Sequence, residues 1–193
     1  MFRKSITDKE INELPQIQFE GNIHIIDKDN KIYDAVEELK RHSVIGFDTE
    51  TKPNYRKGQR NKVALLQLAT ENDAYLFRLH YLTDFNSIYS ILSDEKIIKV
   101  GVAINGDFKE LNHLQKFEPK NFVELQKYVK KFEIENIGLK KMVAIILGGK
   151  ISKRQQRSNW EKSPLTEAQI LYAATDAWTP LLIFKKLNKL KRP

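Results

Sequence analysis

The amino-acid sequence predicts a single α/β domain built on a central mixed β-sheet. Strand-like and helix-like hydrophobic patterns interleave from residue 23 onwards. Several strands come early in the chain, before the longer helical stretches, and this order favours a mixed sheet flanked by helices. The length of 193 residues is that of one domain, and the chain has no internal repeat.

The first half of the chain carries most of the expected strands. Residues 1–20 are polar with few patterned apolar positions, so we expect a short arm or initial helix packed on the main domain. An apolar run ends at Asp48, and a loop rich in basic residues follows at 52–62. We expect strands at 23–26, 44–47, 63–70 and 74–77, and helices at 35–40 and 85–92.

The second half begins with a strand and becomes mainly helical. Thr166 to Gln169 matches the capping-box pattern, which predicts a helix that runs through Asp176. Pro180 lies inside that helix and lacks an N–H, so we expect a kink or a break there. We also expect strands at 97–103 and 122–125, a helix starting at Asn105-Gly106, and an apolar helix at 139–147 ended by Gly148-Gly149.

Composition limits the classes of partner. The formal net charge is +8, which favours an anionic partner such as nucleic acid. The absence of cysteine excludes disulfides, thiolate metal sites and cysteine nucleophiles. We find no stretch apolar enough to span a membrane and no secretory signal, so we expect an intracellular protein without membrane contact, cytoplasmic if prokaryotic.

Two carboxylates stand close together in Asp48-Thr49-Glu50 at the end of an apolar strand. Residues i and i+2 of a strand point to the same face, so both acids lie side by side. Their mutual repulsion and desolvation are relieved by a divalent cation such as Mg²⁺ or Mn²⁺. The alternative is an acidic strand exit into a solvated loop, because such tripeptides are common.

Three further residues extend this pattern. Asp107 lies at the expected start of a helix, where an acid also favours the helix dipole without any function. Tyr172 and Asp176 are four apart and share a helix face, although Asp176 could equally be a surface residue or a cap. Together the four acids can converge around two metal ions, the usual arrangement for phosphodiester cleavage.

Three ordered motifs resemble those of the DEDD superfamily of 3′–5′ exonucleases. Tyr172, four residues before the last acid, places the chain with the tyrosine branch, which includes ribonuclease D. Residues 62–68, 121–125 and 158–166 are similar to the Werner-type exonuclease domains of that branch. The motifs are Phe47-Asp48-Thr49-Glu50, Val100 to Asp107, and Tyr172-Ala173-Ala174-Thr175-Asp176.

The resemblance implies a ribonuclease H-like fold and a two-metal reaction with Mg²⁺ or Mn²⁺. By position, Asp48, Glu50 and Asp176 would bind the nucleophile-side metal. Asp48 would bridge to a second metal, which Asp107 would hold through water. Tyr172 would orient the attacking water. We therefore expect an arm at 1–20 and an exonuclease domain at 21–193.

Substrate contacts are expected from basic residues on both sides of the acids. The loop after the first motif could reach the nucleic-acid backbone, and Arg157 precedes the catalytic helix. The alternative for the loop is a solvated segment without function. The basic loop residues are Lys52, Arg56, Lys57, Arg60 and Lys62.

The leading prediction is a metal-dependent 3′–5′ exonuclease that acts on DNA. One alternative is a 3′–5′ exoribonuclease of the ribonuclease D type, since the named residues do not separate DNA from RNA. A second alternative is a nucleic-acid-binding module that has lost catalysis, against which the complete set of acids argues.

Overall fold

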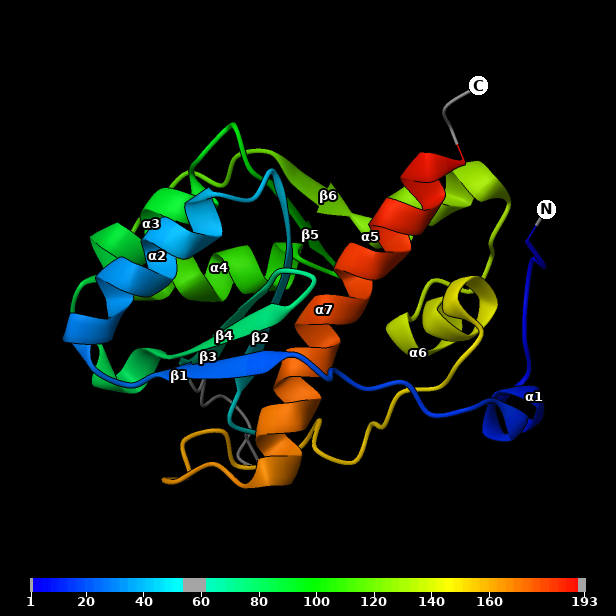
Figure 1. Ribbon diagram of the computed structural model, residues 1–193, viewed down its shortest axis with the longest axis horizontal. Helices are drawn as coiled ribbons and strands as arrows, with labels where there is room; N and C mark the ends of the chain where they lie inside the picture. Colours follow the sequence, from blue (N-terminus) through cyan, green and yellow to red (C-terminus); the bar gives the residue numbers. More distant parts are fainter. Residues whose placement is uncertain (1, 54–61, 191–193) are drawn as a thin grey trace.

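A mixed β-sheet forms the centre of the computed structural model, which describes residues 2–53 and 62–190 (Figure 1). Within these residues, the sheet has the strand order β1-β4-β3-β2-β5-β6. The antiparallel pairs are β2/β3 and β3/β4, whereas β1/β4, β2/β5 and β5/β6 are parallel, which confirms the predicted mixed sheet. The strands are β1 (Asn22–Ile26), β2 (Val44–Thr51), β3 (Val63–Ala69), β4 (Asp73–Arg78), β5 (Ile98–Gly101) and β6 (Phe122–Glu124).

Helices in the described part of the chain occur close to the predicted positions. The α-helices are α1 (Asp8–Glu13), α2 (Ile32–Lys40), α3 (Phe85–Leu92), α4 (Asn105–Leu114), α5 (Leu125–Tyr128), α6 (Leu139–Met142) and α7 (Glu167–Lys189). The 3-10 turns are η1 (Asp29–Lys31), η2 (Leu79–Tyr81) and η3 (Val129–Phe132), and α6 continues as a π-helical turn, η4 (Val143–Leu147). Gly148 ends that turn with a φ of 76°, as expected for a left-handed C-terminal residue.

The two faces of the sheet bury separate apolar clusters. Side chains such as Phe47 and Leu66 pack with α2, α3 and α4 on one face. Leu65, which alternates with Leu66 along β3, packs on the opposite face with residues of α7. Figure 1 shows α7 crossing the sheet obliquely, and α1 and α6 lie at the edge of the molecule farthest from α2 and α3.

A glycine lets α7 approach β2 closely. A Cβ atom on Gly46 would lie 1.8 Å from the carbonyl oxygen of Ala177. Only glycine leaves room for this contact between strand and helix backbones. The contact brings Asp176, next to Ala177, over the part of β2 that carries Asp48.

The predicted helix break at Pro180 is wrong, because α7 continues through it to Lys189. Proline removes the hydrogen bond to the carbonyl of Asp176, a loss of about 3 kcal/mol in an isolated helix. Here the helix is packed against the sheet on both sides of Pro180, and Ala177 and Leu181 are fully buried. Packing thus outweighs the local penalty, while a bend at this position stays a prediction.

The N-terminal arm packs on the main domain as expected. Thr7 and Glu10 form a capping box at the start of α1, and Ile6 and Ile11 are buried in the cluster that contains η4. Farther along, the Phe19 N–H donates to Thr175 Oγ1 over 3.1 Å. The division between arm and domain at residue 20 stays a prediction. No described helix is both long and apolar enough to traverse a bilayer.

Candidate active site

Asp48 and Glu50 project from the same face of β2, towards α7. The strand does not end at Asp48 as predicted but runs on to Thr51, paired with β3. Its parallel neighbour β5 stops earlier, since the last β2/β5 pair is Gly46 with Val100. The acids therefore lie just past the carboxyl end of β5, where the sheet opens on one side of β2.

Helix α7 adds a third acid to this pair. One ligand oxygen from each of Asp48, Glu50 and Asp176 lies within 4.8 Å of the others. The exposed fraction is only 9% for Glu50 and 8% for Asp176. The alternative that Asp176 is a surface residue is therefore wrong. Oδ1 of Asp176 is buried without a hydrogen-bond partner among the described residues. A divalent cation fits this donor set, because it would satisfy the oxygen and neutralise the repulsion.

Burial raises the pKa of all three carboxyl groups. Burial is the largest cause for each, and the charge of Asp176 adds to it at both Asp48 and Glu50. The pKa of Asp48 is raised well above its ordinary value. The pKa of Glu50 rises to about 9 and that of Asp176 to about 7. Without a cation the cluster therefore retains protons near neutral pH.

Asp107 reaches the site from the opposite layer of the fold. It lies in the first turn of α4 and accepts a 2.5 Å hydrogen bond from the Thr49 hydroxyl. Burial raises its pKa to about 6, although this hydrogen bond opposes the shift. The charge of Asp107 raises the pKa of Asp48 and Glu50, so it is electrically coupled to the cluster. It stands apart from the three converging acids and is held in place by Thr49.

Glu124 positions the turn that carries Asp107. Its two carboxylate oxygens accept the backbone N–H groups of Ala103 and Ile104 over 3.1 and 2.9 Å. These donors precede α4, where backbone N–H groups lack helical partners. Ala103 also has a positive φ of 60°, so the turn is strained and needs this support. The sequence predicted the segment 122–125 only as a strand. Glu124 can accept these N–H groups because β6 lies beside β5 in the sheet.

Tyr172 lies one turn before Asp176 on the buried side of α7, with 7% of its surface exposed. Burial, followed by the charge of Asp176, raises its pKa, so the hydroxyl stays protonated. Trp160 is fully buried, and its ring centroid lies 5.8 Å from that of Tyr172. Trp160 therefore packs in the core, against the tyrosine. The side-chain amide of Gln169 donates to Ser158 Oγ and to the Asn159 carbonyl, and so fixes the segment that leads to Trp160.

The predicted nucleic-acid contacts lie in three different settings. Lys52 forms a 2.8 Å ion pair with Glu161, which links the end of β2 to the segment before α7. Lys62 and Arg157 are exposed. Arg56, Lys57 and Arg60 lie outside the described residues. Sequence reasoning also missed Lys153, whose charge lowers the pKa of Asp176. No sequence signal other than its basic neighbourhood marks Lys153.

A family model described as 3′-5′ exonuclease matches residues 23–191. The chain belongs to the 3′–5′ exonuclease family. It is 34% identical over 205 residues to the bifunctional 3′-5′ exonuclease/ATP-dependent helicase WRN of Mus musculus, covering 97% of this chain and 14% of that protein. The chain spans about half, or less, of the length of the curated relatives it matches first.

Solved structures of this family have the same fold. The Aedes aegypti Nibbler EXO domain matches with a TM-score of 0.80 and 26% identity, covering 91% of this chain and 94% of that domain. Escherichia coli RNase D matches with a TM-score of 0.79 and 26% identity, covering 87% of this chain and 44% of that enzyme. The fold is the ribonuclease H-like exonuclease fold implied by the sequence motifs.

Proposed function

We propose that this chain hydrolyses phosphodiester bonds from the 3′ end of DNA, with two divalent metal ions, Mg²⁺ or Mn²⁺. The observation that carries the proposal is the convergence of Asp48, Glu50 and Asp176 within 4.8 Å; Asp107 stands apart from them, hydrogen-bonded to Thr49. When bound at such a site, two divalent ions would supply a hydroxide nucleophile and stabilise the leaving oxygen. Asp48, Glu50 and Asp176 would hold one ion, and Asp48 with Asp107 the other.

Each protein group has a distinct part in this scheme. The Tyr172 hydroxyl is protonated, so it orients the attacking water through a hydrogen bond and does not act as a base. Trp160 holds the tyrosine ring in position. Thr49 fixes the orientation of the Asp107 carboxylate. Substrate contacts are proposed for Lys62, Arg157 and the basic residues of the loop after β2, and for Lys52 once its ion pair with Glu161 opens.

The choice of DNA rests on the degree of similarity. Identity is 34% over 97% of this chain with the exonuclease/helicase WRN, against 25% over 95% of it with ribonuclease D of Haemophilus influenzae. The second candidate function is an exoribonuclease, which the structural likeness to RNase D across 87% of this chain favours. Discrimination between DNA and RNA depends on a contact to the 2′-hydroxyl.

Nucleotide release from a 3′-recessed labelled duplex tests the proposal. We expect release with Mg²⁺ or Mn²⁺ and none with a chelator. Asp48→Asn/Glu50→Gln should abolish it, whereas the matched surface variant Asp34→Asn/Glu13→Gln should behave as wild type, because both of its residues are exposed. Equal activity of the two double variants would refute the site.

Parallel digestion of DNA and RNA strands of the same sequence decides the substrate. A higher kcat/KM on DNA is expected, and a higher value on RNA would establish the exoribonuclease instead. Tyr172→Phe should lower kcat more than it raises KM, because the hydroxyl orients the attacking water and does not contribute to substrate binding.

A further inference from the structure

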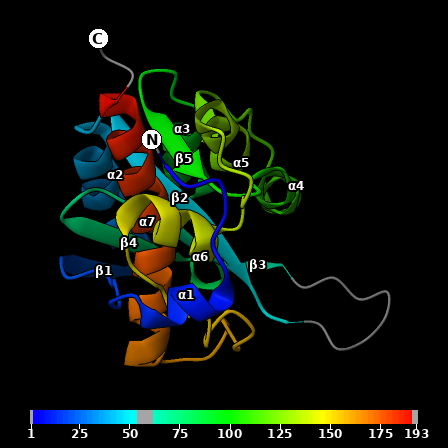
Figure 2. The same cartoon turned by 90° about the vertical axis from the view of Figure 1, so that its right-hand side faces the viewer.

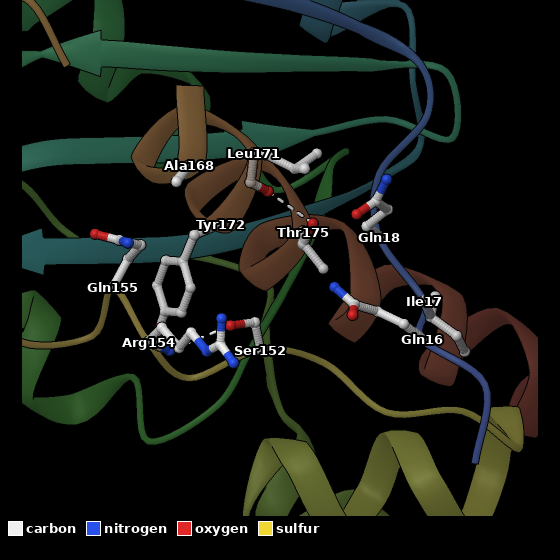
Figure 3. A pocket seen from close by; sticks show the side chains of 10 residues that line it. All are labelled: Gln16, Ile17, Gln18, Ser152, Arg154, Gln155, Ala168, Leu171, Tyr172 and Thr175. Atoms are coloured by element: carbon white, nitrogen blue, oxygen red, sulfur yellow. Dashed lines mark hydrogen bonds between the residues drawn. The ribbon is translucent and has the colours of Figure 1, made fainter. Parts of the chain in front are cut away.

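Two adjoining hollows lie beside the catalytic helix. The first has a volume of about 260 Å³ and is lined by Tyr172 and Thr175 of α7 together with Arg154 (Figure 3). The second has a volume of about 350 Å³ and is lined by Lys140 and Lys153. Both hollows are bordered by Gln16, Ser152 and Arg154. They therefore adjoin, and together they are here called the 150–155 groove, which leads away from Tyr172.

The walls of this groove are held by long-range contacts. The Ile17 N–H donates to the Lys150 carbonyl, and the Lys150 N–H donates to the Pro15 carbonyl, each over 2.8 Å. These bonds fasten the N-terminal arm to the segment before α7. Figure 3 shows Gln16 and Gln18 on the arm, Arg154 and neighbouring side chains on that segment, and Tyr172 on the helix, gathered around the hollow.

The lining of the groove is basic and polar. No acidic residue occurs among the described residues that line either hollow. Lys153 and Arg154 are exposed, and neither forms an ion pair with another described residue. Lys140 pairs with Asp8, and Lys150 Nζ donates to a backbone carbonyl. The charges of Lys153 and Arg154 are thus available to an anionic ligand. The neighbouring carboxylates do not attract such a ligand.

Tyr172 connects this groove to the acid cluster. It lines the groove and lies one helical turn before Asp176 on α7. A strand whose terminal phosphodiester lies at the acids must continue away from them, and the 150–155 groove is the adjoining basic path.

We propose that the 150–155 groove binds the sugar–phosphate backbone of a single-stranded substrate on the 5′ side of the bond that is cleaved. The inference rests on the proposed exonuclease function and names the path of its substrate. Lys153 and Arg154 contact phosphates, and the amides of Gln16 and Gln155 and the Ser152 hydroxyl provide further hydrogen bonds. Such contacts position a strand without reading its sequence.

Binding to the inactive Glu50→Gln protein tests the groove separately from catalysis. Fluorescence anisotropy would measure affinity for labelled oligothymidylates of three and ten nucleotides with free 3′ hydroxyls. Lys153→Gln/Arg154→Gln should weaken binding of the ten-mer about tenfold or more, since hydrogen bonds to charged groups are lost. The slope of log K against log salt should fall by about 1.4 in magnitude, that is, about 0.7 for each phosphate contact.

The matched control is Lys28→Gln/Lys116→Gln, in which two exposed lysines outside the groove lose their charge. Equal weakening by the control and the groove variant would overturn the proposal. An equal loss on the three-mer and the ten-mer would overturn the placement on the 5′ side, because the effect should grow with strand length. Failure of wild type to release nucleotides with metal would refute the proposed function, whereas the groove is judged by binding alone.

Discussion

Replacing Glu50 by glutamine should stabilise the metal-free protein while removing its activity. Glu50 is 9% exposed, and burial followed by the charges of Asp176 and Asp107 raises its pKa from 4.5 to about 9. Folding at pH 7 therefore requires the side chain to take up a proton that the unfolded chain has lost. That uptake costs about 3 kcal/mol, at 1.36 kcal/mol for each pH unit between 4.5 and 7. Glutamine is neutral in both states and avoids the cost.

The sign of the pH dependence follows from the direction of the shift. The folded state keeps its proton between pH 4.5 and about 9, so the stabilisation from Glu50 protonation is full below pH 4.5 and declines as pH rises. The advantage of Glu50→Gln should be small at pH 5 and reach about 3 kcal/mol at pH 7. For a chain of this size that corresponds to about 6–12 °C in Tm.

Thermal unfolding followed by circular dichroism in a chelating buffer at pH 5, 6 and 7 measures this difference. Glu13→Gln is the control, since Glu13 is exposed at the end of α1. Adding Mn²⁺ to 1,000 Kd should reverse the order at pH 7, because wild type then gains about 4.1 kcal/mol, more than the advantage of the metal-free variant, and the variant loses a ligand. A Tm of the metal-free variant at or below that of wild type at pH 7, or a difference independent of pH, would refute the reasoning.

Three further predictions concern the supports of the site. Gly46→Ala should lower stability by at least 1–3 kcal/mol in chemical denaturation, because its methyl group collides with the Ala177 carbonyl; unchanged stability would show that α7 can shift freely. Thr49→Val should lower activity about 10- to 100-fold by releasing the carboxylate of Asp107, whereas Thr49→Ser should retain most of it; equal kcat/KM for the two variants would contradict this role. Lys99 is fully buried, and burial lowers its pKa to about 8. Between pH 8 and 10.5 only the unfolded chain still carries the proton, so the stability of wild type relative to Lys99→Met should increase over this range. Parallel curves of stability against pH for the two proteins would contradict this.

Much of the fold could be predicted because its signals are local. The capping box at Thr166 and Gln169 forms as expected, with Gln169 N–H donating to Thr166 Oγ1 over 3.2 Å. Alternation of apolar residues located β1, and apolar runs on either side of the turn at 71–73 located β3 and β4. Pro180 shows where local reasoning fails, since its cost is real but smaller than the gain from burying both neighbouring turns of α7.

The spacing of the candidate site was visible in the sequence, but its environment was not. The i and i+2 relation of Asp48 and Glu50 is a property of any strand, and it holds in β2. The hydrogen bond from Thr49 to Asp107 joins two elements, and its existence depends on where α4 begins relative to β2. The ion pair between Lys52 and Glu161 likewise joins two distant segments. It engages a lysine that the sequence analysis assigned to substrate contact.

The sequence by itself determined the order of strands and helices, the exonuclease motifs and the excess of positive charge. Tertiary structure decided that Asp176 is buried against β2, that its acid neighbours keep their protons without metal, and that the N-terminal arm completes the 150–155 groove. The physical reason is range. Periodicity, capping and side-chain chemistry act within a few residues, whereas desolvation, charge coupling and groove shape arise only when distant segments pack together.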